Sequence, residues 1–255
     1  MKIKFLLALA VAAILALTSC EKDDPATGPT NNPVPAKRLK KVTSTEAGAV
    51  TVYNLTYDNN RLISYKTPDN RKYVVFSYDA QGNLTGIEEQ EEDFKNVYAY
   101  RYANNLPLSG TFKSWRLASG QPADLIEDDS LTYTVTNNQV TAIRLDMLQT
   151  AEVANLQLTY NNGNLTKIVS NGQFAYTANF GFGTHRSAFP KVSKFVLDQA
   201  GFSLQFASNN DIISASYDFP GTDFDKNINT QYTYDSNGYV LTSNDGSEQM
   251  VFEYE

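Results

Sequence analysis

The chain has 255 residues and a net charge of −7, with 28 acidic and 21 basic side chains, one histidine and one cysteine. Such an acidic chain is a poor electrostatic match for nucleic acid, so we expect no nucleic-acid partner. A single cysteine excludes a disulfide framework, and one cysteine with one histidine excludes an ordinary zinc site. We therefore expect no metal and no cofactor. The 16 tyrosines and 14 phenylalanines favour strands over helices.

The parts of the first segment follow one another in the order found in export signals. Two lysines precede an uninterrupted apolar run, residues 5–17, which is too short to span a bilayer as a stable helix. The run ends in "LTSC", residues 17–20, which resembles the bacterial lipobox. The resemblance implies that residues 1–19 are removed as a lipoprotein signal peptide and that Cys20 carries the lipid. The alternative is a chance cysteine after an ordinary cleavage site.

The four residues after the lipobox are Glu21, Lys22, Asp23 and Asp24. They resemble the acidic export signal of surface-displayed lipoproteins of the Bacteroidetes, which implies an outer-membrane lipoprotein at the cell surface. A periplasm-facing anchor is the alternative. Residues 25–36 then hold four of the nine prolines and no charge, which is typical of an extended tether. Residues 20–36 are thus expected to be the lipidated cysteine and its tether.

The remaining chain, residues 37–255, is long enough to form one large β domain. A chain of this size should bury roughly 70% of its unfolded surface, so it needs no metal or disulfide for stability. We predict a single domain of repeated β-hairpins.

A hairpin pattern recurs at least six times along this domain. In three copies two loop residues separate the strands, which is typical of a type I′ turn: Asn59-Asn60, Asn137-Asn138 and Asn162-Gly163. In three other copies the second strand begins one residue later. These copies predict a type I turn followed by a residue in the left-handed conformation, namely Gly82, Asn210 or Gly238.

The strands that lead into these turns alternate apolar and polar residues. Leu156, Leu158 and Tyr160 share one face, for example, and Phe202, Leu204 and Phe206 share another. This period of two predicts an antiparallel sheet with one wet face. The spacing between residues 160 and 206 fits two hairpins, one of them a degenerate copy near "YTANFGFG", residues 176–183.

Together these patterns predict an all-β, antiparallel up-and-down meander of repeated hairpins. We expect a strongly curved sheet or barrel that is soluble, with its apolar face inward. The alternative is a membrane-spanning barrel with the apolar face toward lipid. Charged stretches such as "EEQEEDF", residues 88–94, stand where lipid would be expected and count against that alternative.

Few residues suggest catalysis, metal binding or ligand binding. Paired carboxylates at residues 88–93 and 127–129 are expected to be solvated hairpin tips, and His185 an ordinary loop residue. Residues 223–227, "DFDKN", resemble the start of a calcium loop but lack its later glycine and glutamate. Trp115 stands in what the pattern predicts to be the least regular stretch, residues 106–129. It is the candidate ligand-binding residue, with burial in the core as the alternative.

The Tyr-Asp-x-x-Gly pattern at Tyr78 and Tyr234 resembles the YD repeats of large surface shells. The whole layout of lipobox, short linker and hairpin repeats resembles a family of Bacteroidetes lipoproteins of unknown function. That resemblance implies a porin-like fold.

We therefore predict a lipid-anchored envelope or cell-surface β module with a non-enzymatic binding role. Its ligand would be a glycan or a protein. The alternative is a structural or assembly accessory of an outer-membrane complex, and a hydrolase is a third reading. Exposed aromatic residues around Trp115 would favour a glycan, and a flat apolar patch would favour a protein partner.

Overall fold

The computed structural model describes residues 36–118, 123–172, 175–198 and 203–255. Within them lie 17 strands and one short helix. The first nine strands are β1 (Leu39–Glu46), β2 (Ala49–Asp58), β3 (Arg61–Lys66), β4 (Tyr73–Tyr78), β5 (Leu84–Glu91), β6 (Phe94–Ala103), β7 (Leu106–Arg116), β8 (Asp124–Thr136) and β9 (Gln139–Met147). The others are β10 (Glu152–Asn161), β11 (Asn164–Gly172), β12 (Tyr176–Arg186), β13 (Asn210–Asp218), β14 (Lys226–Asn229), β15 (Gln231–Tyr234), β16 (Val240–Asn244) and β17 (Glu248–Tyr254), with the helix α1 (Leu204–Ala207) before β13.

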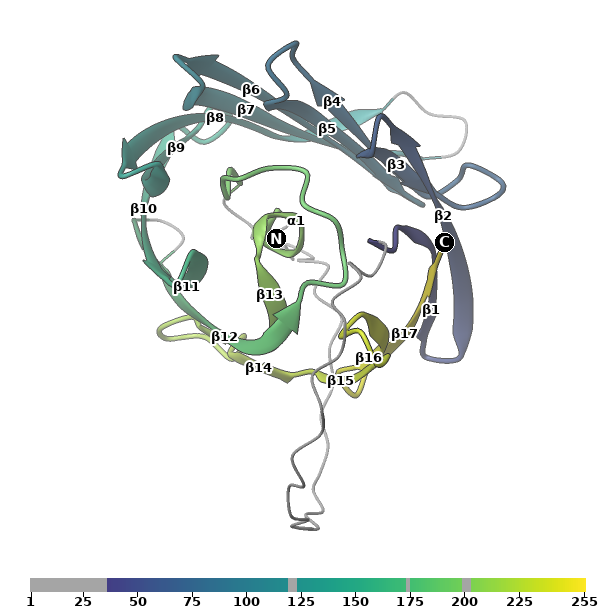
Figure 1. Cartoon of the computed structure of the whole chain (residues 1–255). Helices are drawn as coiled ribbons and strands as arrows, with labels where there is room; N and C mark the ends of the chain where they lie inside the picture. The colour runs from purple at the N-terminus through teal and green to yellow at the C-terminus, as the bar shows by residue number, and fades with distance from the viewer. Residues whose placement is uncertain (1–35, 119–122, 173–174, 199–202) are drawn as a thin grey trace, which may run out of the picture.

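The strands form an antiparallel meander that closes on itself (Figure 1). Each strand except β14 pairs with the next along the chain, and β17 returns to pair with β1 from Leu39↔Tyr254 to Glu46↔Glu248. Strands β14 and β15 are separated only by Thr230, whose N–H donates to the carbonyl of Ile213 on β13. They are therefore two halves of one interrupted strand, with β14 paired to β13 and β15 paired to β16. The predicted meander and barrel are confirmed.

Five of the six predicted turns have the expected backbone. Both central residues have positive φ at the three two-residue turns, with φ of 46° and 66° at Asn59-Asn60 and 49° and 78° at Asn162-Gly163. Gly82 and Gly238 take φ of 86° and 75° in the longer turns. Asn104-Asn105 forms a further turn of the first type, with φ of 52° and 60°, which the sequence reading missed.

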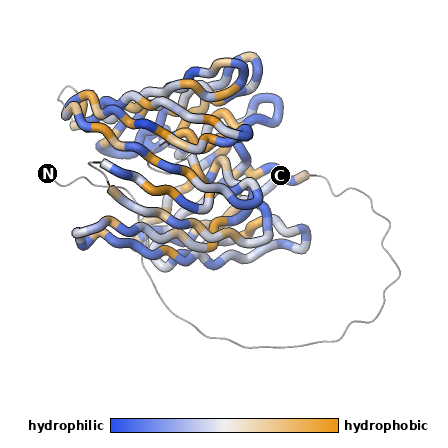
Figure 2. The backbone as a smooth tube through the Cα atoms, turned by 90° about the vertical axis from the view of Figure 1, so that its left-hand side faces the viewer, coloured by the Kyte–Doolittle hydropathy of each residue, from blue (hydrophilic) through white to orange (hydrophobic). Residues whose placement is uncertain are grey.

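The apolar face of the sheet points inward, as predicted. On β10, Ala154, Leu156 and Leu158 are buried, whereas the polar residues between them are exposed. Figure 2 shows the same alternation of apolar and polar residues along the stacked strands. The outer wall of the barrel is thus mostly polar, and its core lies inside the ring of strands.

An inner segment between β12 and β13, residues 187–198 and 203–207, lies inside the barrel (Figure 1). Its apolar side chains belong to the main core, and Phe206 in α1 is fully buried, with its ring 5.2 Å from that of Phe76. The Val192 N–H donates to the carbonyl of Phe206 at 3.0 Å, which joins the two ends of the segment. The Tyr133 hydroxyl of β8 donates to the carbonyl of Leu197 at 2.6 Å, which ties the segment to the wall.

The prediction for this part of the chain was wrong. Leu204 and Phe206 lie in α1 rather than in a strand, and Phe202 lies outside the described residues. Asn210 begins β13 and has no positive φ, so the sixth predicted hairpin does not exist. A short apolar run fits a buried helix as well as a strand, because periodicity alone does not separate the two.

Two other local expectations also fail. "YTANFGFG" is part of the single strand β12 rather than a hairpin. Residues 106–129, expected to be irregular, are mostly the long strands β7 and β8, with residues 119–122 outside the described chain. Cross-strand pairing over the whole of β7 overrides the weak local pattern there.

Candidate functional site

A concavity of about 320 Å³ opens on the outer wall of the barrel where β12, β13 and β14 run side by side. We call it the wall groove. It is lined by Asn179, Phe180, Gly181, Ser214, Ala215, Ser216, Asn227, Ile228 and Asn229. Phe180, Ala215 and Ile228 are buried and face the core. The alternation of the strands therefore places the side chains of the asparagines and serines outward.

Small residues keep the groove open. A Cβ atom on Gly181 would collide with the Ser214 hydroxyl in its present position, so that hydroxyl would have to turn away. Across the groove, the Asn179 amide donates to the Ser216 hydroxyl at 3.4 Å. Asn179, Asn227 and Asn229 are exposed, and no charged side chain lines the groove. The polar part of the lining thus consists of neutral amides and hydroxyls, each able to donate or accept hydrogen bonds, and apolar atoms make up the rest.

A second polar region lies on β8. Glu127 and Asp129 stand opposite Ser114 and Phe112 of β7; Asp129 is only 1% exposed, whereas Glu127, nearer the start of the strand, is exposed. Burial and the neighbouring charge of Glu127 raise the pKa of Asp129 to about 8. Partial desolvation also raises the pKa of Glu127, and the two carboxyls hydrogen-bond to each other. At neutral pH the pair therefore holds a proton.

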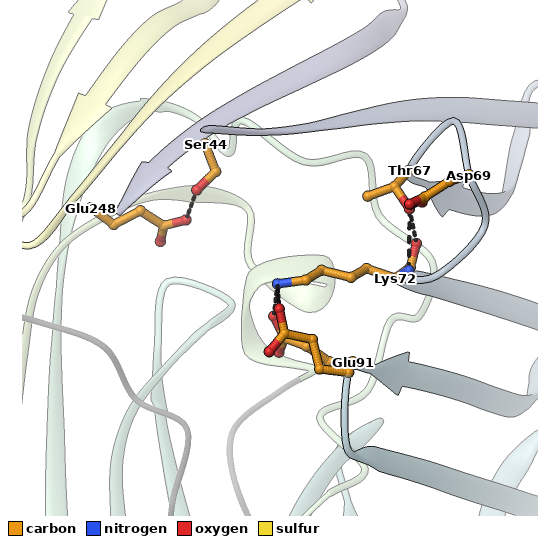
Figure 3. Close-up of polar contacts among 7 residues, drawn as sticks. Ser44, Thr67, Asp69, Lys72, Glu91 and Glu248 are labelled. Carbon is orange, nitrogen blue, oxygen red and sulfur yellow. Dashed lines mark hydrogen bonds and ion pairs between the residues drawn. The ribbon is translucent and has the colours of Figure 1, made fainter. Parts of the chain in front are cut away.

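The acidic run at residues 88–93 is only partly a hairpin tip. Glu89 lies within β5 opposite Val74, and burial raises its pKa. Lys72, in the turn before β4, has its Nζ 3.2 Å from a carboxylate oxygen of both Glu91 and Glu92 (Figure 3). Lys72 and Glu91 line a small cavity of about 80 Å³. The paired carboxylates predicted as solvated tips are instead partly engaged with Lys72.

Further polar contacts within the chain lie in the same view. Figure 3 shows the Ser44 hydroxyl of β1 hydrogen-bonded to the Glu248 carboxylate of β17, across the seam that closes the barrel. The Thr67 hydroxyl donates to Asp69 at 2.6 Å and accepts the Lys72 N–H at 3.1 Å. These contacts hold the turn between β3 and β4, so we assign them a structural role.

His185 lies in β12 rather than in a loop. Its ring stacks on Tyr234, with 3.7 Å between ring centroids, and its backbone N–H donates to Asp211 at 2.9 Å. The Tyr234 hydroxyl donates to the other oxygen of Asp211 at 2.7 Å. The buried Asp211 carboxylate thus joins β12, β13 and β15, and Gly183 leaves space for it because a Cβ there would collide with that carboxylate.

The predicted functional residues do not come together. Cys20, Glu21, Lys22, Asp23 and Asp24 lie outside the described residues. Trp115 lies on β7, half-buried, opposite Lys95 and Leu125. Figure 1 places β7 on the other side of the barrel from the wall groove.

The calcium-like stretch holds its own loop together. In the turn between β13 and β14, the Asp225 carboxylate accepts the Phe219 N–H at 2.9 Å. Among the residues that the structure describes, no group of three or more His, Cys, Asp or Glu side chains is placed to hold a metal ion.

No helix within the described residues is long and apolar enough to cross a membrane.

The sequence reading missed the groove residues. Their signal is faint: outward positions in β12, β13 and β14 are asparagine, serine and glycine, with no lysine or glutamate among those that line the groove. The sequence reading also compared "DFDKN", residues 223–227, with the opening of a calcium loop or with a turn, and it did not recognise β14.

Comparison with known proteins identifies the fold. No protein-family model matches the chain, and no curated protein matches it. Among solved structures, a porin-like protein from Bacteroides vulgatus is similar with a TM-score of 0.55 and 11% identity, over 86% of this chain and 99% of that one. A porin-like protein from Bacteroides uniformis has a TM-score of 0.49 and 13% identity, over 85% and 98%. At such identity the first likeness establishes a porin-like barrel fold and nothing about activity.

Proposed function

We propose that this chain is a lipid-anchored envelope protein that binds its ligand on the outside of a filled barrel and has no catalytic role. The observation that carries the proposal is the inner segment. Its residues Val192, Phe195, Leu197, Leu204 and Phe206 are buried in the main core of the barrel. A barrel whose interior is packed with its own side chains offers a ligand only its outer surface and its ends.

The lipid anchor rests on the sequence. The "LTSC" motif at residues 17–20 follows an apolar run, and residues 25–36 form a proline-rich tether. The described domain begins at β1, next to the last strand β17, so the tether would leave the barrel beside Glu255. The wall groove lies on β12 to β14. Tethering at the end of the barrel leaves this wall free for a ligand.

A non-catalytic role is supported by the work that the reactive side chains already do. The Asp211 carboxylate accepts hydrogen bonds from the backbone N–H of His185 and from the Tyr234 hydroxyl, and the His185 ring stacks on Tyr234. The Ser187 hydroxyl donates to the carbonyl of Gln205, and the Ser193 hydroxyl accepts the backbone N–H of Phe195. The Asp211 and Ser187 contacts join separate parts of the barrel, and the Ser193 contact is local.

Fractionation and surface proteolysis test the proposal. Cys20→Ser should move the protein from the membrane to the soluble fraction, because it removes the sulfur to which the lipid attaches. Sedimentation of fully processed Cys20→Ser protein with the membranes would refute the anchor. Changing both Asp23 and Asp24 to Ala should hide the protein from protease added to intact cells without reducing its amount. Protection of the unaltered protein would instead place it in the periplasm.

A further inference from the structure

The wall groove has the chemistry of a site for one class of ligand. Its outward side chains are the amides of Asn179, Asn227 and Asn229 and the hydroxyls of Ser214 and Ser216. Each amide offers two donors and an acceptor, and each hydroxyl can donate and accept. A saccharide presents the same mixture, because every hydroxyl of a sugar ring is both donor and acceptor. We propose that the wall groove binds a neutral, hydroxyl-rich saccharide. This inference rests on the proposed function and names the ligand class.

The charge of the groove selects against ionic ligands. The protein carries a net charge of −7, yet none of the nine lining residues is charged. A phosphorylated or uronic-acid ligand would find no cation in the lining and an acidic protein around it. A cationic ligand would find no carboxylate there to replace its hydration. A neutral ligand loses least on transfer from water.

The shape of the groove is held by the core beneath it. Phe180 is 6% exposed and its ring meets that of Tyr217 edge-on at 6.0 Å, while Ala215 and Ile228 are each 7% exposed. Asn179 of β12 pairs with Ser216 of β13, and Ser216 pairs in turn with Asn227 of β14, so backbone pairing joins all three strands. The backbone that carries the hydrogen-bonding groups is thus fixed before a ligand arrives, which lowers the entropy cost of binding.

Size and topology narrow the choice further. A volume of about 320 Å³ is at the small end of ligand pockets, which run from roughly 300 to 1,000 Å³. It suits one or two sugar rings. Within the groove, β13 is paired on both sides, with β12 and β14, so a peptide could add as a strand only along the other edge of β14.

The test uses the full chain carrying Cys20→Ser and a panel of neutral gluco-, manno-, galacto- and xylo-oligosaccharides, screened on an array and then titrated calorimetrically. We expect at least one neutral oligosaccharide to bind. The double variant Asn227→Ala/Asn229→Ala should weaken that binding roughly tenfold or more, since it removes two sets of hydrogen bonds. Ser216→Trp should abolish it by filling the groove.

The matched control is Asn155→Ala/Asn171→Ala. These two asparagines are exposed cross-strand partners on β10 and β11, outside the groove. They should change the affinity by less than about twofold. Unfolding midpoints close to that of the parent chain will show that each variant is folded.

Three results would overturn the inference: no neutral oligosaccharide binds, the control weakens binding as much as the groove variants, or uronic-acid oligosaccharides or a serine- and asparagine-rich peptide bind more tightly. These outcomes leave the anchor untouched, because it is judged by fractionation. Conversely, a protein that binds the sugar but is not lipidated would refute only the anchor.

Discussion

Replacing Asp129 with Asn should stabilise the barrel at neutral pH. The Asp129 carboxyl lies inside the barrel on β8, 1% exposed, and hydrogen-bonds to Glu127. Its pKa is raised to about 8 because burial and the charge of Glu127 both oppose ionisation. Folding at neutral pH therefore requires the carboxyl to take up a proton. Asn is neutral at every pH and keeps a donor for Glu127.

The magnitude follows from the two pKa values. The unfolded carboxyl titrates near 3.8 and the folded one near 8, so the folded state binds more protons between these values. The stability that this group contributes is fully present below pH 3.8, falls as pH rises, and levels off above pH 8. Each unit in this window costs about 1.4 kcal/mol, which gives about 4 kcal/mol by pH 7. Asp129→Asn should recover up to that amount at pH 7 and less than about 1 kcal/mol at pH 4.

Urea denaturation of the Cys20→Ser chain at pH 4 and pH 7, followed by the fluorescence of the single tryptophan, measures both values. Asp128→Asn is the control, since this neighbour pairs with Lys113 of β7 at 2.9 Å. It should lose at most about 1 kcal/mol, as is typical of an ion pair near the surface. A gain from Asp129→Asn that is equal at both pH values, or a loss at pH 7, would refute the reasoning.

Three further predictions concern one turn, the contact between Gly183 and Asp211, and the effect of reductant and chelator on unfolding. Gly163→Val should lower the free energy of unfolding by at least about 1 kcal/mol, because φ there is 78° and a Cβ would lie 2.6 Å from the Asn209 amide. Asn161→Val should lower it by less. Equal losses from the two variants would show that the turn register is wrong. Gly183→Ala should cost about 1–3 kcal/mol by displacing the Asp211 carboxylate from its donors, and an unchanged melting temperature would contradict that contact. Unfolding should be insensitive to reductant and to chelator; a marked drop in melting temperature with chelator would instead support a calcium site at residues 223–227.

Much of the barrel is encoded by local sequence. The positive φ of Asn59, Asn137 and Gly163 follows from residue types that tolerate it, within a few positions of each turn. The alternation of Leu156 and Leu158 with polar neighbours assigns one face of β10 to the core. Both patterns span fewer than ten residues, so the chain carries them wherever it lies in space.

Only the tertiary structure decides the rest. Strands β1 and β17 are about 200 residues apart in the chain, and no local sequence pattern predicts that they pair. Phe206 looked like a strand residue, yet it lies in a helix because the barrel interior accepts a compact apolar segment there. Asp129 looked like part of a solvated tip, but it is buried between the neighbouring strands β7 and β9. The wall groove exists because three strands bring small neutral side chains together. Closure, burial and concavity depend on which residues face each other across the fold, and a period of two along one strand carries no information about that.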